Sequence, residues 1–473
     1  MTRDDPNRSV PVLLIQPPQG TFVYKRIFQP GVEIPLHLLY LSAYLTREGI
    51  ENRCLDMRVL HHPERELVDV LQETRPRLVG ISACTTEIDN AGETAAAVKR
   101  TLGETPVVLG GYHASALPEE TLGRYPAVDY IILGEGEISL TCLIRRILAG
   151  QDVLDVPGLG FRHGEAARLN EPPPLVENLD SLPFPCREIM NLDRYVPSPG
   201  TGNFMQLPST GIIGSRGCPY QCRYCSKGVW GHTVRFRSPE NIVQEIEHCI
   251  RQHGIHDFRF YDDMLTYPKF DIAAFCDLIL QADWKITWNC YSRVNHITRE
   301  RLAMMKAAGC YHIKYGIEFG TEKALRIADK RATLDMARNA VRITKSLGIE
   351  CKGNFILGIP EETYEDCVKT IEFAKELSPD LVSFYPFDAF PGTMFYTKYG
   401  KDGLAKVCLP RDVTEELASL AYRKFYFRPS FIWQRARRIL TNPRREIRLL
   451  SNGIYMMGKF YAKRRMLSIL HRS

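Results

Sequence analysis

Short β-rich runs alternate with amphipathic helical runs over the first 150 residues. The segment VPVLLIQPP (10–18) predicts a strand, and PLHLLYLSAYLTREG (35–49) predicts an amphipathic helix that ends at Gly49. Four more strand-like runs follow, at 51–59, 77–86, 106–115 and 128–137, with helical runs between them. Strands that alternate with helices indicate a parallel sheet with helices on both faces. We therefore predict an α/β, doubly wound, Rossmann-like domain over residues 1–150, with ligands at the carboxyl ends of its strands.

A second α/β series begins after a proline-rich stretch. Residues 151–209, which include EPPPLVENLDSLPFPCREIM, have little periodicity and predict a connecting segment. Six strand-like runs then follow, at 210–217, 257–265, 286–294, 311–319, 351–360 and 381–392, with helical runs between them. Six such units predict a partial (β/α)6 barrel over residues 210–400, with reactive residues on the loops after the strands.

Basic charge is concentrated in a helical C-terminal region, residues 401–473. From Tyr422 to Ser473 there are 14 Lys or Arg residues against one acid, Glu446, although the whole chain carries only +6. We consider three roles for this tail: a helix packed on the barrel, a membrane-surface contact, or a polynucleotide contact. Packing is favoured, membrane contact is an alternative, and no nucleic-acid partner is expected.

The chain has the composition of an ordinary soluble protein, with 44% hydrophobic and 25% charged residues over 473 positions. Its N-terminus resembles neither a signal peptide nor a membrane span, and its 14 cysteines are not arranged as a small disulfide scaffold. We expect a cytoplasmic protein.

Three cysteines lie within eight residues of the first barrel unit. Cys218, Cys222 and Cys225 form C-x3-C-x2-C in GSRGCPYQCRYCSKG. Thiolates bind zinc or iron–sulfur clusters, but a structural zinc site needs four ligands, and the chain has no second C-x-x-C. The simplest interpretation is a 4Fe–4S cluster with three protein ligands and one iron open to a substrate or cofactor. Zinc with a distant ligand, or a fortuitous group of thiols, is the alternative.

This cysteine spacing, with Tyr224 before the last cysteine, resembles the radical S-adenosylmethionine (SAM) superfamily. The resemblance implies that SAM binds the open iron and is cleaved to a 5′-deoxyadenosyl radical, which takes hydrogen from the substrate. It also implies an external electron donor such as flavodoxin or ferredoxin. Carried over residue by residue, it assigns SAM contacts to Asp262 and Asp263 (amino group), Arg293 (carboxylate), Glu318 (ribose), and Gly358, Ile359 and Pro360 (adenine).

The N-terminal half resembles the cobalamin-binding domain fused to one branch of that superfamily, through VVLGGYHASALPEE, VDYIILGEGE and the linker phrase LDSLPFPCREIMNLDRY. The resemblance implies cobalamin contacts from Ser82, Thr85, Gly110, Gly111, Tyr112, His113, Gly134, Glu135 and Gly136. The D-x-H-x-x-G signature of other cobalamin proteins is missing, so a purely structural Rossmann-like domain is the alternative. His37 replaces the glycine that the family usually has. We expect it to face solvent, and contact with the cofactor is the alternative.

The leading hypothesis is a radical SAM enzyme that acts on a small molecule, with cobalamin carrying a methyl group to a substrate carbon. A second hypothesis keeps the radical step without methylation, as dehydration, cyclisation or redox rearrangement of a sugar, polyol or tetrapyrrole. In that case Asp388, at the end of the sixth strand, would be the catalytic acid. A non-catalytic iron–sulfur module is a third possibility.

Overall fold

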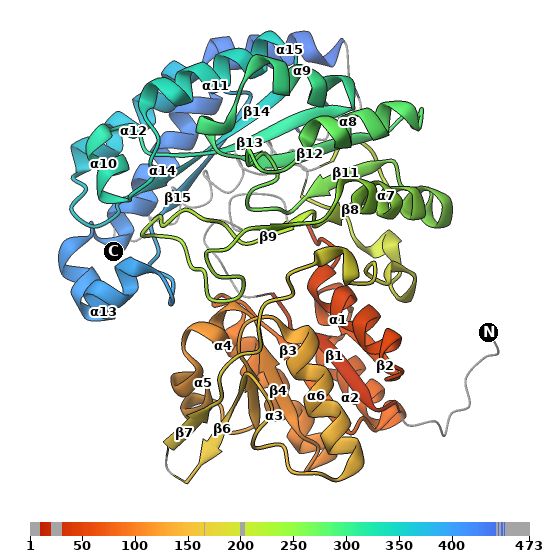
Figure 1. The fold of residues 1–473 in the computed structure, drawn as a ribbon. Helices are drawn as coiled ribbons and strands as arrows, with labels where there is room; N and C mark the ends of the chain where they lie inside the picture. The colour runs from red at the N-terminus through yellow and green to blue at the C-terminus, as the bar shows by residue number, and fades with distance from the viewer. Residues whose placement is uncertain are drawn as a thin grey trace.

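Two large sheets, one above the other in Figure 1, organise the chain. The computed structural model describes residues 10–19, 31–164, 166–198, 204–440, 443, 446, 447 and 449. The first sheet has the order β2-β1-β3-β4-β5-β6-β7, and β1 to β5 are parallel. These five strands are β1 (Val12–Gln16), β2 (Asn52–Asp56), β3 (Leu78–Ser82), β4 (Val107–Gly110) and β5 (Tyr130–Ile132).

Helices cover both faces of the first sheet, as the alternating pattern predicts. They are α1 (Leu36–Arg47), α2 (Pro63–Thr74), α3 (Ile88–Leu102), α4 (Tyr112–Ala116), α5 (Pro118–Arg124) and α6 (Gly136–Ala149). One apolar core packs α2 and α3 against one face of the sheet, and a second core packs α1 and α6 against the other. Strands buried on both faces explain the continuous apolar runs in the sequence.

A β-hairpin extends this sheet beyond residue 150. Strands β6 (Leu159–His163) and β7 (Ala166–Leu169) pair antiparallel, and β6 pairs antiparallel with β5. The rest of the segment is extended chain with short 3-10 turns, η3 (Leu179–Ser181), η4 (Arg187–Ile189) and η5 (Leu192–Arg194). Prolines remove backbone donors, which fits a segment that runs along other elements without joining a sheet.

The second sheet contains six parallel strands in the order β15-β14-β13-β12-β11-β8. They are β8 (Ser209–Ile212), β11 (Asp257–Phe260), β12 (Thr287–Ser292), β13 (Cys310–Glu318), β14 (Glu350–Leu357) and β15 (Leu381–Pro386). In the described chain β8 and β15 remain edges, so the predicted partial (β/α)6 barrel is confirmed. Phe258, Phe260 and Trp288 are among the fully buried side chains between the sheet and its helices.

Helices pack on the outer face of this sheet (Figure 1). They are α7 (Pro239–His253), α8 (Ile272–Gln281), α9 (Arg299–Ala307), α11 (Leu334–Ser346), α12 (Tyr364–Leu377) and α14 (Arg411–Tyr426). The helices α10 (Glu322–Ile327) and α13 (Met394–Val407) belong to a separate core with Phe319 and Ile359, just after β13 and β14. Between β8 and α7 a small antiparallel pair, β9 (Ser215–Arg216) and β10 (Arg235–Phe236), brackets residues 217–234, which we call the cysteine loop.

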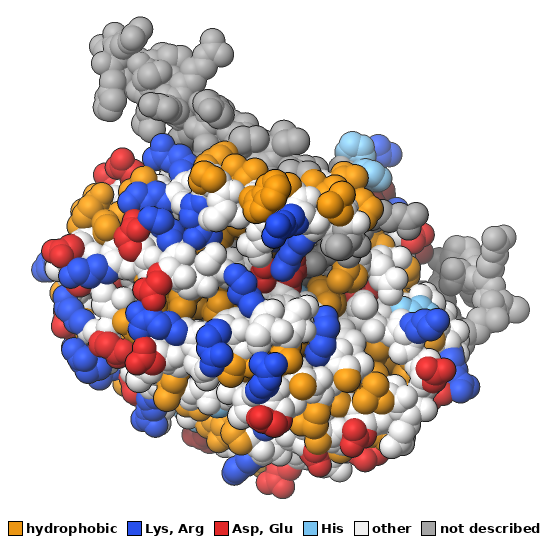
Figure 2. All heavy atoms as spheres, turned by 90° about the horizontal axis from the view of Figure 1, so that it is seen from above, with side chains coloured by type: hydrophobic (Ala, Val, Ile, Leu, Met, Phe, Trp, Pro, Cys, Tyr) orange, Lys and Arg blue, Asp and Glu red, His pale blue; other side chains and the backbone are white. Residues whose placement is uncertain are grey.

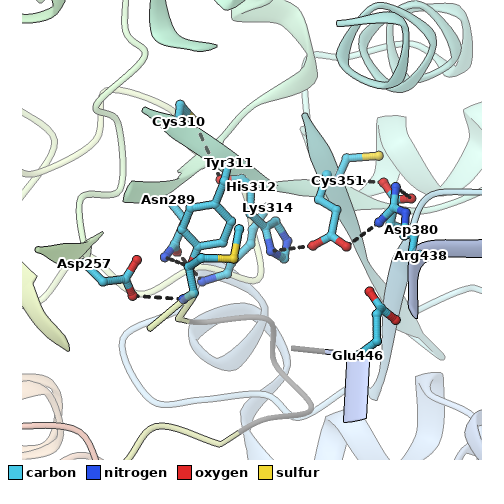
Figure 3. A network of polar contacts seen from close by, with 12 residues as sticks. Asp257, Asn289, Cys310, Tyr311, His312, Lys314, Cys351, Asp380, Arg438 and Glu446 are labelled. Carbon is cyan, nitrogen blue, oxygen red and sulfur yellow. Dashed lines mark hydrogen bonds and ion pairs between the residues drawn. The ribbon is translucent and has the colours of Figure 1, made fainter. Parts of the chain in front are cut away.

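The last described helix, α15 (Pro429–Ile439), packs on the amino-terminal edge of the barrel strands through ion pairs (Figure 3). Arg435 donates to Glu350 at 3.2 Å and to Glu446 at 2.9 Å, and Arg438 donates to Asp380 at 2.7 Å. Part of the tail's positive charge therefore meets buried acids of the barrel. Among the described residues, no helix is long and apolar enough to cross a membrane.

Candidate functional site

The cysteine loop leaves the carboxyl end of β8 and is held at both ends by the β9–β10 pair. Cys218 and Cys222 are buried, Cys225 is half-buried, and all three are free thiols. Gly217 has φ +90°, and a Cβ there would lie 2.2 Å from the carbonyl oxygen of Thr233. Only glycine fits this close approach, so Gly217 sets the path of the loop just before the first cysteine.

The three sulfur atoms are spread more widely than a single metal ion requires. Sulfur ligands of one tetrahedral zinc ion lie about 3.8 Å apart, given a Zn–S distance of about 2.3 Å. In the described chain, the only group of three potential ligands within 4.8 Å of one another lies elsewhere, so the three thiols do not form such a group. A wide set of thiols in one short loop fits the larger cluster better than zinc.

Positive side chains surround the thiols. A guanidinium nitrogen of Arg293 lies 3.5 Å from Cys222 Sγ, and the guanidinium stacks 3.7 Å from the ring centre of Tyr220. The same guanidinium donates to the carbonyl oxygen of Lys330. Burial alone would lower the pKa of Lys227, but the charges of Cys225 and Cys218 raise it above its ordinary value. Burial raises the pKa of the Cys225 thiol, and the Lys227 charge opposes that rise, so Lys227 favours the thiolate form that binds iron.

The two predicted aspartates point in different directions. Asp262 is buried and accepts hydrogen bonds from the Gly214 amide (3.1 Å) and the Ser215 hydroxyl (2.6 Å), so it fixes the strand before the cysteine loop. Burial raises its pKa to about 6. Asp263 is exposed, and Lys227 acts electrostatically on it. Of the two, Asp263 is the carboxylate that a ligand can reach.

Tyr224 and Glu318 meet at a lysine that the sequence did not single out. Lys330 Nζ donates to Glu318 Oε1 at 3.0 Å and to the Tyr224 hydroxyl at 3.1 Å. Glu318 ends β13 with φ +71°, a left-handed conformation that costs about 1 kcal/mol or more for a residue with a side chain. The ion pair with Lys330 holds the carboxylate beside the cysteine loop despite that strain.

The turn after β14 is organised by Glu362, which sequence reasoning also missed. Its Oε2 accepts hydrogen bonds from the amides of Gly358 (2.8 Å) and Ile359 (3.1 Å). Its Oε1 is buried and has no hydrogen-bond partner among the described residues. Burial raises the pKa of Glu362 to about 7. Gly358, Ile359 and Pro360 are all buried in this turn.

Asp388 lies on the loop after β15 and is half-buried. It accepts a hydrogen bond from Arg411 at 2.5 Å, and Arg411 also pairs with Glu415 on α14. Asp388 therefore joins the loop after β15 to α14 through an ion pair, and its catalytic role stays a prediction.

A cavity of about 470 Å³ separates the first sheet from the cysteine loop. One wall is the carboxyl edge of the first sheet and the start of α1, where the predicted residues Ser82, Gly110, Gly111, Tyr112, Gly134, Glu135 and Gly136 all line it. The opposite wall includes Ile213 and Arg216 beside the cysteine loop, and Val229 and Trp230 within it. The rings of Tyr112 and Trp230 pack edge to face across the gap, 6.3 Å apart.

The glycines give the sheet edge of the cavity its shape. A Cβ at Gly110 would meet nothing within 4 Å, so this backbone borders open space. Gly111 has φ +99°, and a Cβ there would lie 2.6 Å from the carbonyl oxygen of Ala83. The cavity is mostly apolar in its lining residues and is large enough for an organic cofactor.

Two of the predicted cobalamin contacts lie outside the cavity lining. His113 Nδ1 lies 3.2 Å from the Thr85 hydroxyl, and neither residue is part of the cavity lining. His37 is exposed, as expected, and it also lines the cavity from the first turn of α1. Desolvation of its ring by the cavity wall, with a smaller effect of Arg58, lowers its pKa to about 4, so the imidazole is neutral.

Two family models match the chain. The B12 binding domain matches residues 30–144, and the Radical SAM superfamily matches residues 212–374. The first match contains the glycines of the cavity, and the second contains the three cysteines.

Curated relatives match over most of the chain. An uncharacterized methyltransferase of Pyrococcus horikoshii is 29% identical over 441 residues, which covers 89% of this chain and 93% of that protein. The anaerobic magnesium-protoporphyrin IX monomethyl ester cyclase of Rubrivivax gelatinosus is 26% identical over 391 residues, 80% of this chain and 69% of the cyclase.

Among solved structures, the radical SAM methyltransferase TsrM of Kitasatospora setae, with cobalamin and a [4Fe-4S] cluster bound, has a TM-score of 0.67. It is 21% identical, and the alignment covers 83% of this chain and 75% of TsrM. At this identity the match shows a shared fold.

Proposed function

The chain belongs to the radical SAM enzymes that carry a cobalamin-binding domain, and from this membership we propose that it methylates a carbon atom of a small-molecule substrate. S-adenosylmethionine would serve both as radical source and as methyl donor. Relatives named as methyltransferases support this choice, and the match to the Pyrococcus protein extends over nearly its whole length.

The donor set of the cysteine loop fits a 4Fe–4S cluster. We propose that Cys218, Cys222 and Cys225 hold three of its irons and that Arg293 balances the charge of the bound thiolates. We propose that cobalamin lies in the cavity against the edge formed by Gly110, where a Cβ would project into open space. Bound there, the cluster would supply the electron that cleaves S-adenosylmethionine, and cobalamin would supply a carrier for the methyl group.

The residues at the carboxyl ends of the barrel strands would orient S-adenosylmethionine. Asp263 is accessible for the amino group, and the Glu318–Lys330 pair offers polar groups beside the cysteine loop. The turn at Gly358 and Ile359 would pack against the adenine, with both amides committed to Glu362. Asp262 would act indirectly, because both of its carboxylate oxygens are bound to residues 214 and 215.

One observation carries the proposal: the carboxyl edge of the first sheet, where we place cobalamin, and the cysteine loop line the same cavity. Gly110 and Gly134 line one side, and Val229 and Trp230 line the other. A methyl carrier and a radical source must reach the same substrate atom, so this proximity is what such a reaction requires. We propose the two functional units as residues 1–150 and 210–400, joined by 151–209.

The proposal is tested by product analysis after anaerobic reconstitution with cluster, cobalamin, reductant and labelled S-adenosylmethionine. We expect 5′-deoxyadenosine and S-adenosylhomocysteine in comparable amounts. The Cys222→Ala variant should form no 5′-deoxyadenosine, and protein reconstituted without cobalamin should form no S-adenosylhomocysteine. If the complete enzyme makes 5′-deoxyadenosine alone, the methyl-transfer proposal is wrong and the radical rearrangement of the cyclase relatives replaces it.

We also propose two further partners. An external one-electron donor such as flavodoxin or ferredoxin would reduce the cluster. An anionic membrane surface would contact α15, whose side chains Ile432 and Trp433 are 55% and 62% exposed. Figure 2 shows hydrophobic and basic side chains side by side on one face of the molecule. The surplus of basic residues after Tyr422 favours an anionic surface over a neutral one.

A further inference from the structure

A second group of metal-ligating side chains lies away from the cavity and the cysteine loop. Glu188 on η4, and His248 and His253 on α7, each place one potential ligand atom within 4.8 Å of the others. Glu188 is exposed, and both histidines are half-buried. The helix α7 has 15 residues and rises about 22 Å from the β10 end to its last residue, His253. The group is therefore at the far end of α7 from the cysteine loop.

A buried ion pair fixes the two segments that carry this group, the connecting segment and α7. Arg187, next to Glu188, donates to Glu245 at 2.6 Å, and both side chains are fully buried. Glu245 lies three residues before His248, so it shares that face of α7. The Arg187–Glu245 pair thus joins the connecting segment to α7. Arg187 is one residue from Glu188, and Glu245 is about one turn before His248, so the pair holds the ligand residues together without a metal.

The two histidine rings lie close to each other, as two ligands of one metal ion do. Their ring centres lie 6.1 Å apart with an edge-to-face arrangement, and Phe184 packs 6.3 Å from the ring of His248. His253 Nε2 is buried and has no hydrogen-bond partner within the described chain. A buried ring nitrogen without a partner is unfavourable unless something occupies it.

We propose that Glu188, His248 and His253 form a Zn²⁺ site that ties the connecting segment to α7. Two imidazoles and one carboxylate are ligands that suit zinc, whereas magnesium and calcium prefer oxygen ligands alone. Three protein ligands leave a fourth position for water. The site is independent of the methyl-transfer proposal, because none of its residues lines the cavity or belongs to the cysteine loop.

The test uses the full chain with its iron–sulfur cluster in place, so that zinc cannot occupy the cysteines. After incubation with Zn²⁺ and dialysis, we expect one zinc per chain by elemental analysis, counted separately from iron. The His248→Asn and His253→Asn variants should lose this zinc and keep their iron. His163→Asn, which changes an exposed histidine of the first domain, is the matched control and should keep both metals.

Two further measurements distinguish this site from others. Co²⁺ bound by histidine and carboxylate should give weak visible bands without the intense sulfur charge-transfer absorption of a thiolate site, and Glu188→Gln should weaken its binding. Zn²⁺ should raise the unfolding temperature of the wild type and of His163→Asn, but not of the His248 and His253 variants. Absence of zinc from the wild type, or equal zinc in all four proteins, would overturn the proposal.

Discussion

Glu135 and Arg235 form a two-pronged ion pair between the two sheets. Both carboxylate oxygens of Glu135 accept from the Arg235 guanidinium, each at 2.9 Å, and Oε1 also accepts from Arg216 at 2.9 Å. Arg216 and Arg235 are the residues of β9 and β10 at the two ends of the cysteine loop. Glu135 precedes α6 at the edge of the cavity, so one buried carboxylate couples the first sheet to the loop that carries the cysteines.

Replacing Glu135 by alanine should destabilise the protein strongly. Burial alone would raise the pKa of Glu135, but the hydrogen bonds of Arg235 and the charge of Arg216 lower it, so the carboxylate is charged at neutral pH. Removing it leaves buried guanidinium groups without a full set of partners, at a cost of about 3–5 kcal/mol in the free energy of unfolding. Anaerobic thermal or denaturant unfolding measures this loss.

The control for Glu135→Ala is Lys369→Ala, which breaks an exposed ion pair with Glu365 on α12. Because both side chains are exposed to solvent, which screens their charges, that pair should contribute little to the free energy of unfolding. Equal destabilisation by the two variants would contradict the coupling role of Glu135. Glu135→Ala should also retain less cobalamin after gel filtration than Lys369→Ala does.

Gly217→Ala should prevent assembly of the iron–sulfur cluster. The new methyl group would lie 2.2 Å from the Thr233 carbonyl oxygen, and the left-handed backbone adds a further cost of about 1 kcal/mol. The loop must shift at the residue before Cys218, so we expect loss of iron and of the cluster's visible absorption. Gly231→Ala is the matched control, since Gly231 also has a positive φ, +65°, but its Cβ would meet nothing within 4 Å. Full iron content in Gly217→Ala would contradict this account.

The fold and the cysteine site could be predicted from the sequence because local sequence patterns mark both of them. Apolar runs of four to six residues predict buried parallel strands, and the structure has a strand in each predicted run of both domains. The alternation of strand faces also separates the two aspartates. Phe258 and Phe260 are buried against the helices, and Asp262 continues that face, whereas Asp263 turns to the other. The sequence therefore distinguishes Asp262 from Asp263, although the prediction from the strand end assigned the same ligand contact to both.

What the sequence could not supply were contacts between distant segments. Lys330 lies 12 residues after Glu318 and 106 after Tyr224, and no periodicity marks it as their common partner. Glu135 was predicted from its glycine neighbours, but its partners Arg216 and Arg235 come 81 and 100 residues later. His37 faces the cavity because α1 begins at the carboxyl edge of the sheet, a placement that depends on the whole domain.

Each cluster cysteine should be essential for iron binding. Replacing Cys218, Cys222 or Cys225 by alanine removes one of only three protein ligands, so iron should fall well below the about four atoms per chain of a complete cluster. Cys142→Ala, on α6 of the first domain, is the control and should keep its iron. Elemental analysis after anaerobic reconstitution makes the comparison. A wild-type protein that contains one zinc bound to these thiols would contradict the cluster.

Glu362 should make stability depend on pH. Its folded-state pKa is raised to about 7 from an ordinary value of 4.5, because the carboxyl group is buried. A raised pKa means that the folded chain binds the proton more tightly, so this contribution to stability is present below pH 4.5 and is lost as the pH rises through about 7. Glu362→Gln should flatten the unfolding free energy over this window. Glu365→Gln, which changes an exposed carboxylate three residues later in the first turn of α12, should leave the slope unchanged.

The exposed face of α15 should bind anionic membranes. Arg435 and Arg438 are committed to barrel acids, but Ile432, Trp433 and Leu440 are 55%, 62% and 85% exposed. An apolar strip within a strongly basic segment is typical of a helix that lies on an anionic bilayer. Wild-type protein should co-sediment with phosphatidylglycerol vesicles more than with phosphatidylcholine vesicles, and salt should weaken the binding.

The double variant Ile432→Asp, Trp433→Asp tests that face directly, because both positions are largely exposed and the new carboxylates would repel the anionic surface. It should lose most vesicle binding and keep its iron content and unfolding temperature. Met394→Asp, at a 54% exposed position on α13, is the control and should bind as the wild type does. If the double variant still binds, or if RNA displaces the vesicles from the wild type, the basic tail rather than α15 is the contact. If the wild-type protein does not bind anionic vesicles, the predicted membrane contact is wrong. In that case α15 has only a structural role, as a helix held to the barrel by its ion pairs.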